Sequence, residues 1–338
     1  MLDFNGCLPY IQQSGRVYHH IIAVKSLNAG TNDEPMNVLN KLVVATLPAV
    51  PKPIIRQFAN RYIAGEEISD AVRVVRDLNA KGAMATLDVL GEDIHLREEA
   101  AAGTEMIIRV LDTIHDGGLD SNVSIKLSQL GLKLDRAFCL DNTCRIAAHA
   151  RALNNFIRID MEDSSCTSDT IWVYRQLRKE FDNLGIVLQA YLKRTRADAE
   201  ALLGDGLKSF RLCKGIYVEP EAIAIKDRAG INRNFIEVLE LMLRSHARVG
   251  IATHDAALVE AGYRLIRELR VPEAEVEFQM LLGVRPELRE RILRDGHRLR
   301  IYVPFGKQWY QYSIRRFKEN PQIAGYVLKA LLNRGHLN

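Results

Sequence analysis

Eight short apolar runs recur between residues 83 and 306 of this sequence, and stretches of helical period separate them. Each run has the length of a strand and is bounded by glycine or polar residues. The runs occupy residues 83–91, 122–131, 156–163, 185–192, 209–216, 249–255, 276–283 and 299–306. Strands that alternate with helices are typical of βαβ units and a parallel sheet. Eight such units are what a TIM-type (β/α)8 barrel requires, so the sequence predicts this α/β fold.

An open, doubly wound sheet is the alternative arrangement for alternating strands and helices. Such sheets usually carry a glycine-rich first turn that binds a nucleotide phosphate. This chain contains neither GxGxxG nor GxxxxGK[ST]. The barrel is therefore the favoured prediction.

The segments outside the strand region define the expected domain organisation. Residues 36–80 have a helical pattern, and we expect Ser69 or Asp70 to cap the start of their last helix and Gly82 to cap its end. Residues 1–35 show no clear pattern and are expected to form a loosely ordered N-terminal segment. No linker composition divides the rest, so residues 36–338 are expected to form one barrel domain that includes the N-terminal helices.

Composition excludes several classes of protein. A formal net charge of +4 over 338 residues, with no long basic block, does not suggest nucleic-acid binding. The five cysteines form no CxxC motif, which favours free thiols in a reducing cytoplasm. The N-terminus lacks the pattern of a signal peptide, and the longest apolar run, residues 42–50, is too short to span a bilayer.

Polar side chains end nearly every predicted strand. In a (β/α)8 barrel the functional site lies at the C-terminal ends of the strands. We therefore expect a site there, formed by Asp88, Lys126, Asp160, Gln189, Arg211, Lys214, Thr253, His254, Gln279 and Tyr302.

A helix with two adjacent arginines is predicted after the last strand and before Pro321. At 100° per residue, its Trp309, Tyr312, Arg315, Arg316 and Glu319 fall within an arc of about 120°. Guanidinium groups bind carboxylates and phosphates bidentately. The arginine pair and the strand-end cations therefore predict an anionic ligand.

Several chemistries remain open from the residues alone, and others are disfavoured. The absence of HxH and HExxH argues against a catalytic metal, and the absence of GxSxG argues against a serine nucleophile. A Schiff base on Lys126 or Lys214 remains possible. So do a phosphate-binding barrel enzyme and an inactive barrel that only binds ligands.

Seven motifs, in order along the chain, resemble those of the proline dehydrogenase family, and most closely its short monofunctional bacterial members. They are SIKLSQLGL, IRIDMEDS, VLQAYLKRT, RLCKGIYVEP, IATHD, VEFQMLLGVRP and RIYVPFGKQWYQYSIRRFKEN. The resemblance extends from about residue 60 to residue 335 and is highly specific.

The resemblance implies an activity and its partners. It implies oxidation of L-proline to Δ1-pyrroline-5-carboxylate, with a hydride passing from proline C5 to N5 of FAD. Electrons would then pass to a membrane quinone, and a separate pyrroline-5-carboxylate dehydrogenase would take the product. The expected localisation is cytoplasmic, with the protein peripheral on the inner face of the cell membrane.

The resemblance also implies roles for the substrate-binding residues. Arg315 and Arg316 would hold the proline carboxylate, on a final helix that lies over the C-terminal ends of the strands. Glu319 would orient this pair, Lys126 would add a third positive contact, and Tyr302 would pack over the proline ring.

For the cofactor, the resemblance places Arg211 against flavin N5 and Asp160 behind the active site. Ile216 departs from the family, which usually has alanine in this KGA motif, and Cys213 replaces a usual valine that packs in the core. The residues expected to line FAD are Met161, Gln189, Ala190, Lys214, Gly215, Ile216, Thr253 and His254.

Overall fold

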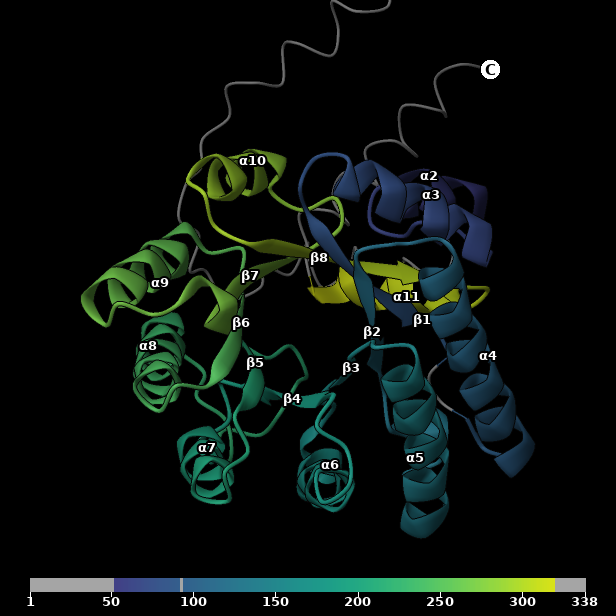
Figure 1. The fold of residues 1–338 in the computed structure, drawn as a ribbon, viewed down its shortest axis with the longest axis horizontal. Helices are drawn as coiled ribbons and strands as arrows, with labels where there is room; N and C mark the ends of the chain where they lie inside the picture. Colours follow the sequence, from purple (N-terminus) through teal and green to yellow (C-terminus); the bar gives the residue numbers. More distant parts are fainter. Residues whose placement is uncertain (1–51, 92–93, 320–338) are drawn as a thin grey trace, which may run out of the picture.

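Eight parallel strands close into a barrel in the computed structural model, which describes residues 52–91 and 94–319 (Figure 1). Neighbouring strands pair in sequence order, and β8 pairs with β1 to close the ring. This confirms the predicted (β/α)8 fold. The strands are β1 (Met84–Val89), β2 (Ser121–Ile125), β3 (Ile157–Ile159), β4 (Leu184–Gln189), β5 (Ser209–Cys213), β6 (Arg248–Ala252), β7 (Val276–Leu281) and β8 (Leu299–Phe305).

Helices surround the barrel as an outer ring (Figure 1). One α-helix follows each strand, and two helices within the described residues precede β1. They are α2 (Lys52–Ala59), α3 (Ile68–Asn79), α4 (Arg97–Asp116), α5 (Arg136–Ala152), α6 (Ser164–Leu177), α7 (Thr195–Gly204), α8 (Arg228–Arg244), α9 (Ala256–Glu268), α10 (Pro286–Arg294) and α11 (Trp309–Glu319).

Alternation along the strands separates the core from the barrel interior. In β5, Phe210 and Leu212 are fully buried in the apolar layer between the strands and the helices. Arg211, between them, instead hydrogen-bonds Ser124 and Gln279 on other strands of the barrel. Side chains at alternate positions point to opposite faces of a strand. A single apolar run can therefore also deliver a charged side chain to the barrel interior.

The predicted N-cap of α3, Ser69 or Asp70, was two or three residues late, since the N-cap is Glu67. The helix begins at Ile68, and Asp70 accepts a hydrogen bond of 3.3 Å from the backbone nitrogen of Glu67. Asp70, which lies inside the first turn, therefore caps the N-terminus of the helix with its side chain. Gly82, with a φ of +79°, lies just beyond the end of the helix, as predicted.

Helix α11 lies where the sequence predicts the final helix. Its buried Tyr312 packs with Ala59, Ile63 and Leu90, and Trp309 packs against the same cluster. Tyr312 also lines the cavity at the C-terminal ends of the strands.

The expectations for residues 1–35 and for residues 36–51 lie outside the described part of the chain.

Candidate active site

A cavity of about 650 Å³ lies at the C-terminal ends of the strands, on the side where barrel proteins carry their functional sites. Its wall contains most of the side chains that the sequence predicts to meet at the strand ends. They are Lys126, Asp160, Gln189, Arg211, Lys214, Thr253, His254, Gln279 and Tyr302, together with Met161, Gly215 and Ile216.

Buried ion pairs form one side of this cavity. Asp160 accepts a hydrogen bond of 2.7 Å from Nη1 of Arg211, and Nζ of Lys126 lies 3.6 Å from its other oxygen. Asp88 does not line the cavity, but it binds Lys126 at 2.6 Å. Each cation is thus held by a carboxylate, which offsets the cost of burying its charge.

The hydroxyl of Tyr302 belongs to the same network. It donates a hydrogen bond of 2.7 Å to Asp160 and accepts one of 3.1 Å from Lys126. Burial, followed by the negative charges of Asp160 and Asp88, raises the pKa of Tyr302 well above its usual value. Tyr302 is therefore a neutral hydrogen-bond donor whose aromatic ring faces the cavity.

Gln279 holds the far side of the Arg211 guanidinium. Its carbonyl oxygen accepts a hydrogen bond from Nε of Arg211, and its amide donates one of 2.5 Å to Glu277. Glu277 in turn accepts a bond of 2.7 Å from Nε of Arg300. The sequence identifies Gln279 as a strand-end residue, but it gives no signal for the contacts of Glu277 and Arg300 inside the barrel.

Two buried polar atoms in the wall have no hydrogen-bond partner among the described residues: Nη2 of Arg211, a donor, and Oε1 of Gln189, an acceptor. Leaving such groups unpaired is costly, so atoms of this kind point to a ligand. The heterocyclic edge of a flavin offers both acceptors and a donor. The residues present therefore fit the cofactor that the sequence resemblance implies.

Asp255 is a site residue that the sequence predictions omit. It accepts hydrogen bonds of 2.7 Å from Lys214 and 3.0 Å from Arg228, and it caps the start of α9. Burial would raise the pKa of Asp255, but these two cations outweigh burial and hold it well below its usual value. An acidic residue directly between a strand and a helix was the available signal.

Other predicted residues hold the backbone of the cavity wall. His254 accepts a hydrogen bond of 2.9 Å at Nε2 from the backbone of Leu281. Gln189 donates one of 3.2 Å to the carbonyl of Met161. Ala190 is fully buried behind the wall, where its backbone bonds Cys213 and Asn234, so its contact with a cofactor stays a prediction.

The remaining predictions concern α11. Its helical backbone includes positions 315, 316 and 319. The side chains of Arg315, Arg316 and Glu319 lie outside what the structure describes, so their contacts with substrate stay predictions.

Within the described residues, neither a metal-ligand cluster nor a reactive thiol is found at this cavity. They contain no group of three or more His, Cys, Asp or Glu side chains arranged to hold a metal ion. Burial raises the pKa of the Cys213 thiol to about 11, so this cavity residue stays protonated at neutral pH.

The closed barrel, with ionisable side chains converging at the C-terminal ends of its strands, has the architecture of a barrel enzyme. Comparison with known sequences makes the class specific. The family model described as proline dehydrogenase matches residues 71–328, and the chain belongs to this family.

Individual relatives agree with the family match. The chain is 38% identical over 276 residues to proline dehydrogenase 1 of Bacillus subtilis subsp. natto, covering 82% of this chain and 91% of the relative. It is 34% identical over 300 residues to proline dehydrogenase of Deinococcus radiodurans, covering 86% and 96%. These comparisons identify the enzyme as a proline dehydrogenase.

A solved structure shares the fold. The crystal structure of proline utilization A from Bdellovibrio bacteriovorus, inactivated by N-propargylglycine, superimposes with a TM-score of 0.77 at 21% identity. The superposition covers 84% of this chain and 37% of that one. This chain thus spans about a third of the larger protein.

Proposed function

We propose that the protein oxidises L-proline to Δ1-pyrroline-5-carboxylate with FAD as its cofactor and a membrane quinone as the final electron acceptor. The observation that carries this proposal is the buried Arg211, fixed by Asp160 and Gln279, with one unpartnered guanidinium nitrogen in the cavity wall. Such a group is suited to negative charge that arrives during a reaction.

The proposed cofactor site lies beside Arg211. Bound FAD would supply the hydride acceptor, N5, for the hydrogen removed from proline C5. Met161, Gln189, Lys214, Gly215, Ile216, Thr253 and His254 would hold the cofactor, because they share this cavity wall. Ile216 is 39% exposed, so its side chain can turn away from a bound group while its backbone stays in contact.

The proposed substrate site lies between Tyr302 and α11. Tyr302 would cover the proline ring, and Lys126 would add positive charge near the carboxylate, which Arg315 and Arg316 would bind bidentately. Asp160 would keep Arg211, Lys126 and the Tyr302 hydroxyl in place. Fixed charges and a covered cavity would orient the substrate and exclude water, which lowers the barrier without any covalent step by the protein.

Ion pairing argues against the Schiff-base alternative. A lysine that forms a Schiff base must present a free amine to a carbonyl group. Lys126 is bound to Asp88 at 2.6 Å, and Lys214 is bound to Asp255 at 2.7 Å. Both amines are therefore held as charged donors.

Anaerobic bleaching tests the proposal directly. The purified full-length protein should be yellow, with flavin absorbance that L-proline bleaches in the absence of oxygen and a quinone restores. A colourless protein that a carbonyl compound and borohydride label covalently would support the Schiff-base alternative. A yellow protein that no imino acid bleaches would support an inactive binding barrel.

Product transfer and location follow from the proposed reaction. A separate pyrroline-5-carboxylate dehydrogenase would consume the product, and a membrane quinone requires at least transient contact with the inner face of the cell membrane. Among the helices of the described region, none combines the length and the apolar character needed to cross a bilayer. Co-sedimentation with quinone-containing vesicles would measure the proposed contact.

A further inference from the structure

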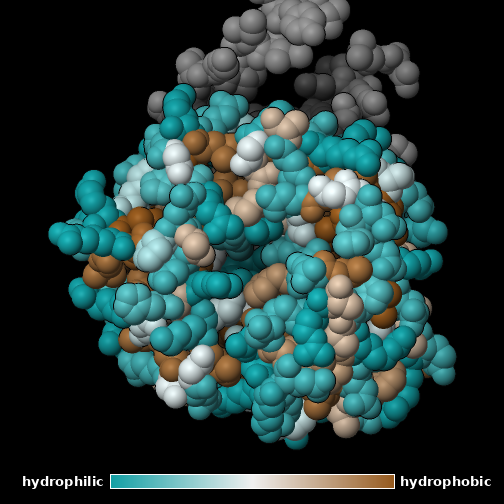
Figure 2. All heavy atoms as spheres, in the orientation of Figure 1, coloured by the Kyte–Doolittle hydropathy of each residue, from teal (hydrophilic) through white to brown (hydrophobic). Residues whose placement is uncertain are grey.

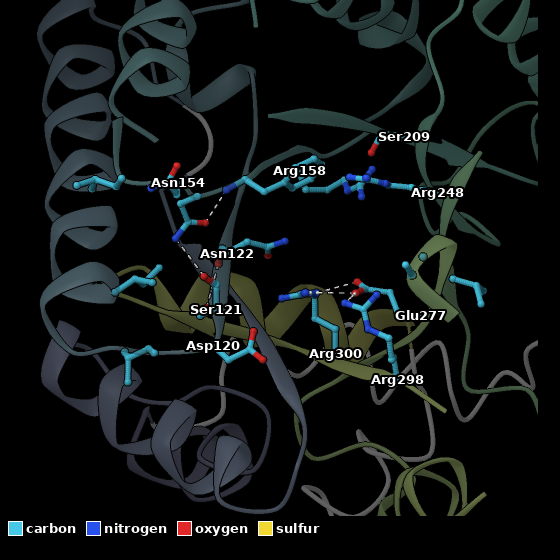
Figure 3. A pocket seen from close by; sticks show the side chains of 18 of the residues that line it. Asp120, Ser121, Asn122, Asn154, Arg158, Ser209, Arg248, Glu277, Arg298 and Arg300 are labelled. Carbon is cyan, nitrogen blue, oxygen red and sulfur yellow. Dashed lines mark hydrogen bonds and ion pairs between the residues drawn. The ribbon is translucent and has the colours of Figure 1, made fainter. Parts of the chain in front are cut away.

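A second cavity lies at the opposite, N-terminal mouth of the barrel. It has a volume of about 530 Å³, and its wall is formed at the N-terminal ends of β2, β3, β5, β6, β7 and β8 (Figure 3). Four arginines line it: Arg158, Arg248, Arg298 and Arg300. None of them takes part in the proposed oxidation of proline, so the cavity calls for a separate explanation.

One carboxylate already neutralises two of these arginines. Glu277 accepts hydrogen bonds of 2.7 and 3.2 Å from Arg300, and it lies 3.9 Å from Arg298. Burial would raise the pKa of Glu277, but the charge and hydrogen bonds of Arg300, together with Gln279 and the charge of Arg158, outweigh burial and lower it. Glu277 is therefore ionised; its hydrogen bonds go to Arg300 and Gln279, and its charge attracts Arg158 only from beyond ion-pair distance.

Arg158 is buried without a carboxylate paired directly to it. It is only 6% exposed, and no carboxylate of the described residues lies within 4.0 Å of its guanidinium group. Its contacts are the carbonyl of Ile186 at 3.4 Å and the ring of Phe156, 4.9 Å away, while its Nε has no hydrogen-bond partner. Burial and then repulsion from Arg211 lower its pKa to about 9, and the attraction of Glu277 does not offset them. A buried cation in this state is costly unless an anion joins it.

The backbone is shaped to keep this guanidinium in place. A Cβ at Gly185 would lie 2.1 Å from Nη1 of Arg158 and 2.6 Å from Oγ of Ser209. Only glycine therefore allows the Arg158 guanidinium and the Ser209 hydroxyl to approach this point together. Both residues line the cavity.

Arg248 supplies a second cation without a carboxylate. It is exposed at the start of β6, and no carboxylate of the described region lies within 4.0 Å of its guanidinium. Figure 3 shows its side chain extending toward that of Arg158, with Ser209 beside them. Two guanidinium groups and a hydroxyl thus face the same cavity, and the carboxylates of its wall, those of Asp120, Glu275 and Glu277, all lie more than 4.0 Å from both guanidinium groups.

We propose that the N-terminal mouth of the barrel is a binding site for a phosphate group, held by Arg158, Arg248 and Ser209. A tetrahedral dianion has enough oxygen atoms to accept from two guanidinium forks and one hydroxyl, whereas a single carboxylate has only two. The cavity admits either inorganic phosphate or a small phosphomonoester. In the face of the molecule that Figure 2 draws, mainly hydrophilic residues surround a central hollow.

Calorimetric titration of the purified full-length protein tests this site. Inorganic phosphate, glycerol 3-phosphate and acetate are compared in a chloride buffer of matched ionic strength, and melting temperature is followed in parallel. We expect saturable phosphate binding that raises the melting temperature. Tighter binding of glycerol 3-phosphate would identify a phosphomonoester as the ligand, and tighter binding of phosphate would identify the free ion. Acetate binding as tightly as phosphate would overturn the proposal.

Two variants and a matched control locate the binding. Arg248→Gln should weaken phosphate binding by tenfold or more. Lys208→Gln removes an equally exposed charge beside the start of β5, outside the cavity wall, and should leave binding unchanged. Arg158→Met should abolish binding without lowering the melting temperature in chloride, because it removes a buried charge that no carboxylate pairs with directly. Equal phosphate binding by the wild type and Arg248→Gln, or no saturable binding by the wild type, would overturn the proposal.

Discussion

The hydroxyl of Tyr302 donates a hydrogen bond of 2.7 Å to Oδ2 of Asp160, which links the middle of β8 to the residue directly after β3. These two strands are not neighbours in the barrel, so the tyrosine reaches across its mouth. The guanidinium carbon of Arg211 lies 5.3 Å from the centre of its ring, and Nζ of Lys126 lies 5.8 Å from it. The ring is thus held in one orientation, as a wall against a bound substrate must be.

Tyr302 variants test whether this wall selects the substrate. Tyr302→Phe keeps the ring, and Asp160 retains Arg211 as a donor, so kcat/KM for proline should fall by about tenfold or less. Tyr302→Ser opens space beside the proline ring, so it should raise KM for proline and increase the activity on 4-hydroxyproline relative to proline. Steady-state kinetics with both substrates measure this ratio. A ratio that stays constant across wild type and both variants would exclude the selectivity role.

Arg211 is expected to act on the flavin and not on the substrate carboxylate. A positive charge beside the flavin stabilises the negative charge that arrives with the hydride. Arg211→Met should therefore lower the reduction potential of the bound flavin and slow anaerobic bleaching, and Arg211→Lys should restore part of both. Affinity for a proline analogue should change less. An unchanged potential combined with a large loss of analogue affinity would assign Arg211 to the carboxylate instead.

Gln279 is expected to position Arg211. Gln279→Leu removes the acceptor of Arg211 Nε and the donor to Glu277, and loss of a hydrogen bond to a charged group costs about 1.5–3 kcal/mol. We expect kcat to fall by about 10- to 150-fold and the flavin potential to shift as in Arg211→Met, with KM for proline nearly unchanged. A loss of thermal stability with an unchanged potential would show that Gln279 serves the fold only.

Gly250 offers an independent test of the same contact. A Cβ at this position would lie 2.4 Å from Nε2 of Gln279, so Gly250→Ala should displace the glutamine and reproduce part of the kinetic effect. Gly204→Ala is the matched control, since a Cβ there would meet nothing within 4 Å. Equal kinetics for these two glycine variants would argue against the positioning role.

The arginine pair of α11 is expected to bind the substrate carboxylate. Arg315→Met and Arg316→Met should each remove a charge-assisted contact worth about 1.5–3 kcal/mol, which corresponds to a loss of about 10- to 150-fold in kcat/KM with FAD content retained. Lys307→Met, which removes an exposed charge just before the helix, is the control. Wild-type kcat/KM in both arginine variants would contradict the assignment.

The fold was predictable because each strand leaves a local signal. Every predicted apolar run contains or overlaps one strand of the barrel, since a parallel strand covered by helices requires continuous apolar residues. Barrel topology then brings the ends of those strands together, which is why Lys126, Asp160, Arg211 and Tyr302 were expected to share a site.

The pairings inside the barrel were not predictable in the same way. Whether Arg211 bonds Gln279, or Arg158 stays without a carboxylate, depends on side-chain direction and strand register, which no local pattern reports. The N-terminal mouth was missed for this reason. Arg158 lies on β3 and Arg248 on β6, three strands further along the chain, and nothing in the sequence marks them as neighbours.

Asp255 should make the stability of the protein depend on pH. Its native pKa lies below the unfolded value, so its contribution is fully present above about pH 4 and is lost as the pH falls further. Asp255→Asn should reduce the free energy of unfolding by about 2 kcal/mol at pH 7, because Lys214 and Arg228 lose a charged acceptor that is only 9% exposed. Urea unfolding between pH 7 and pH 3.5 measures this difference, which should stay constant down to about pH 5 and shrink below pH 4.

Asp169→Asn, which breaks the exposed pair with Arg136, should cost less than about 1 kcal/mol throughout. A difference between wild type and Asp255→Asn that does not change between pH 5 and pH 3.5 would show that the Asp255 charge is not the source of the stability.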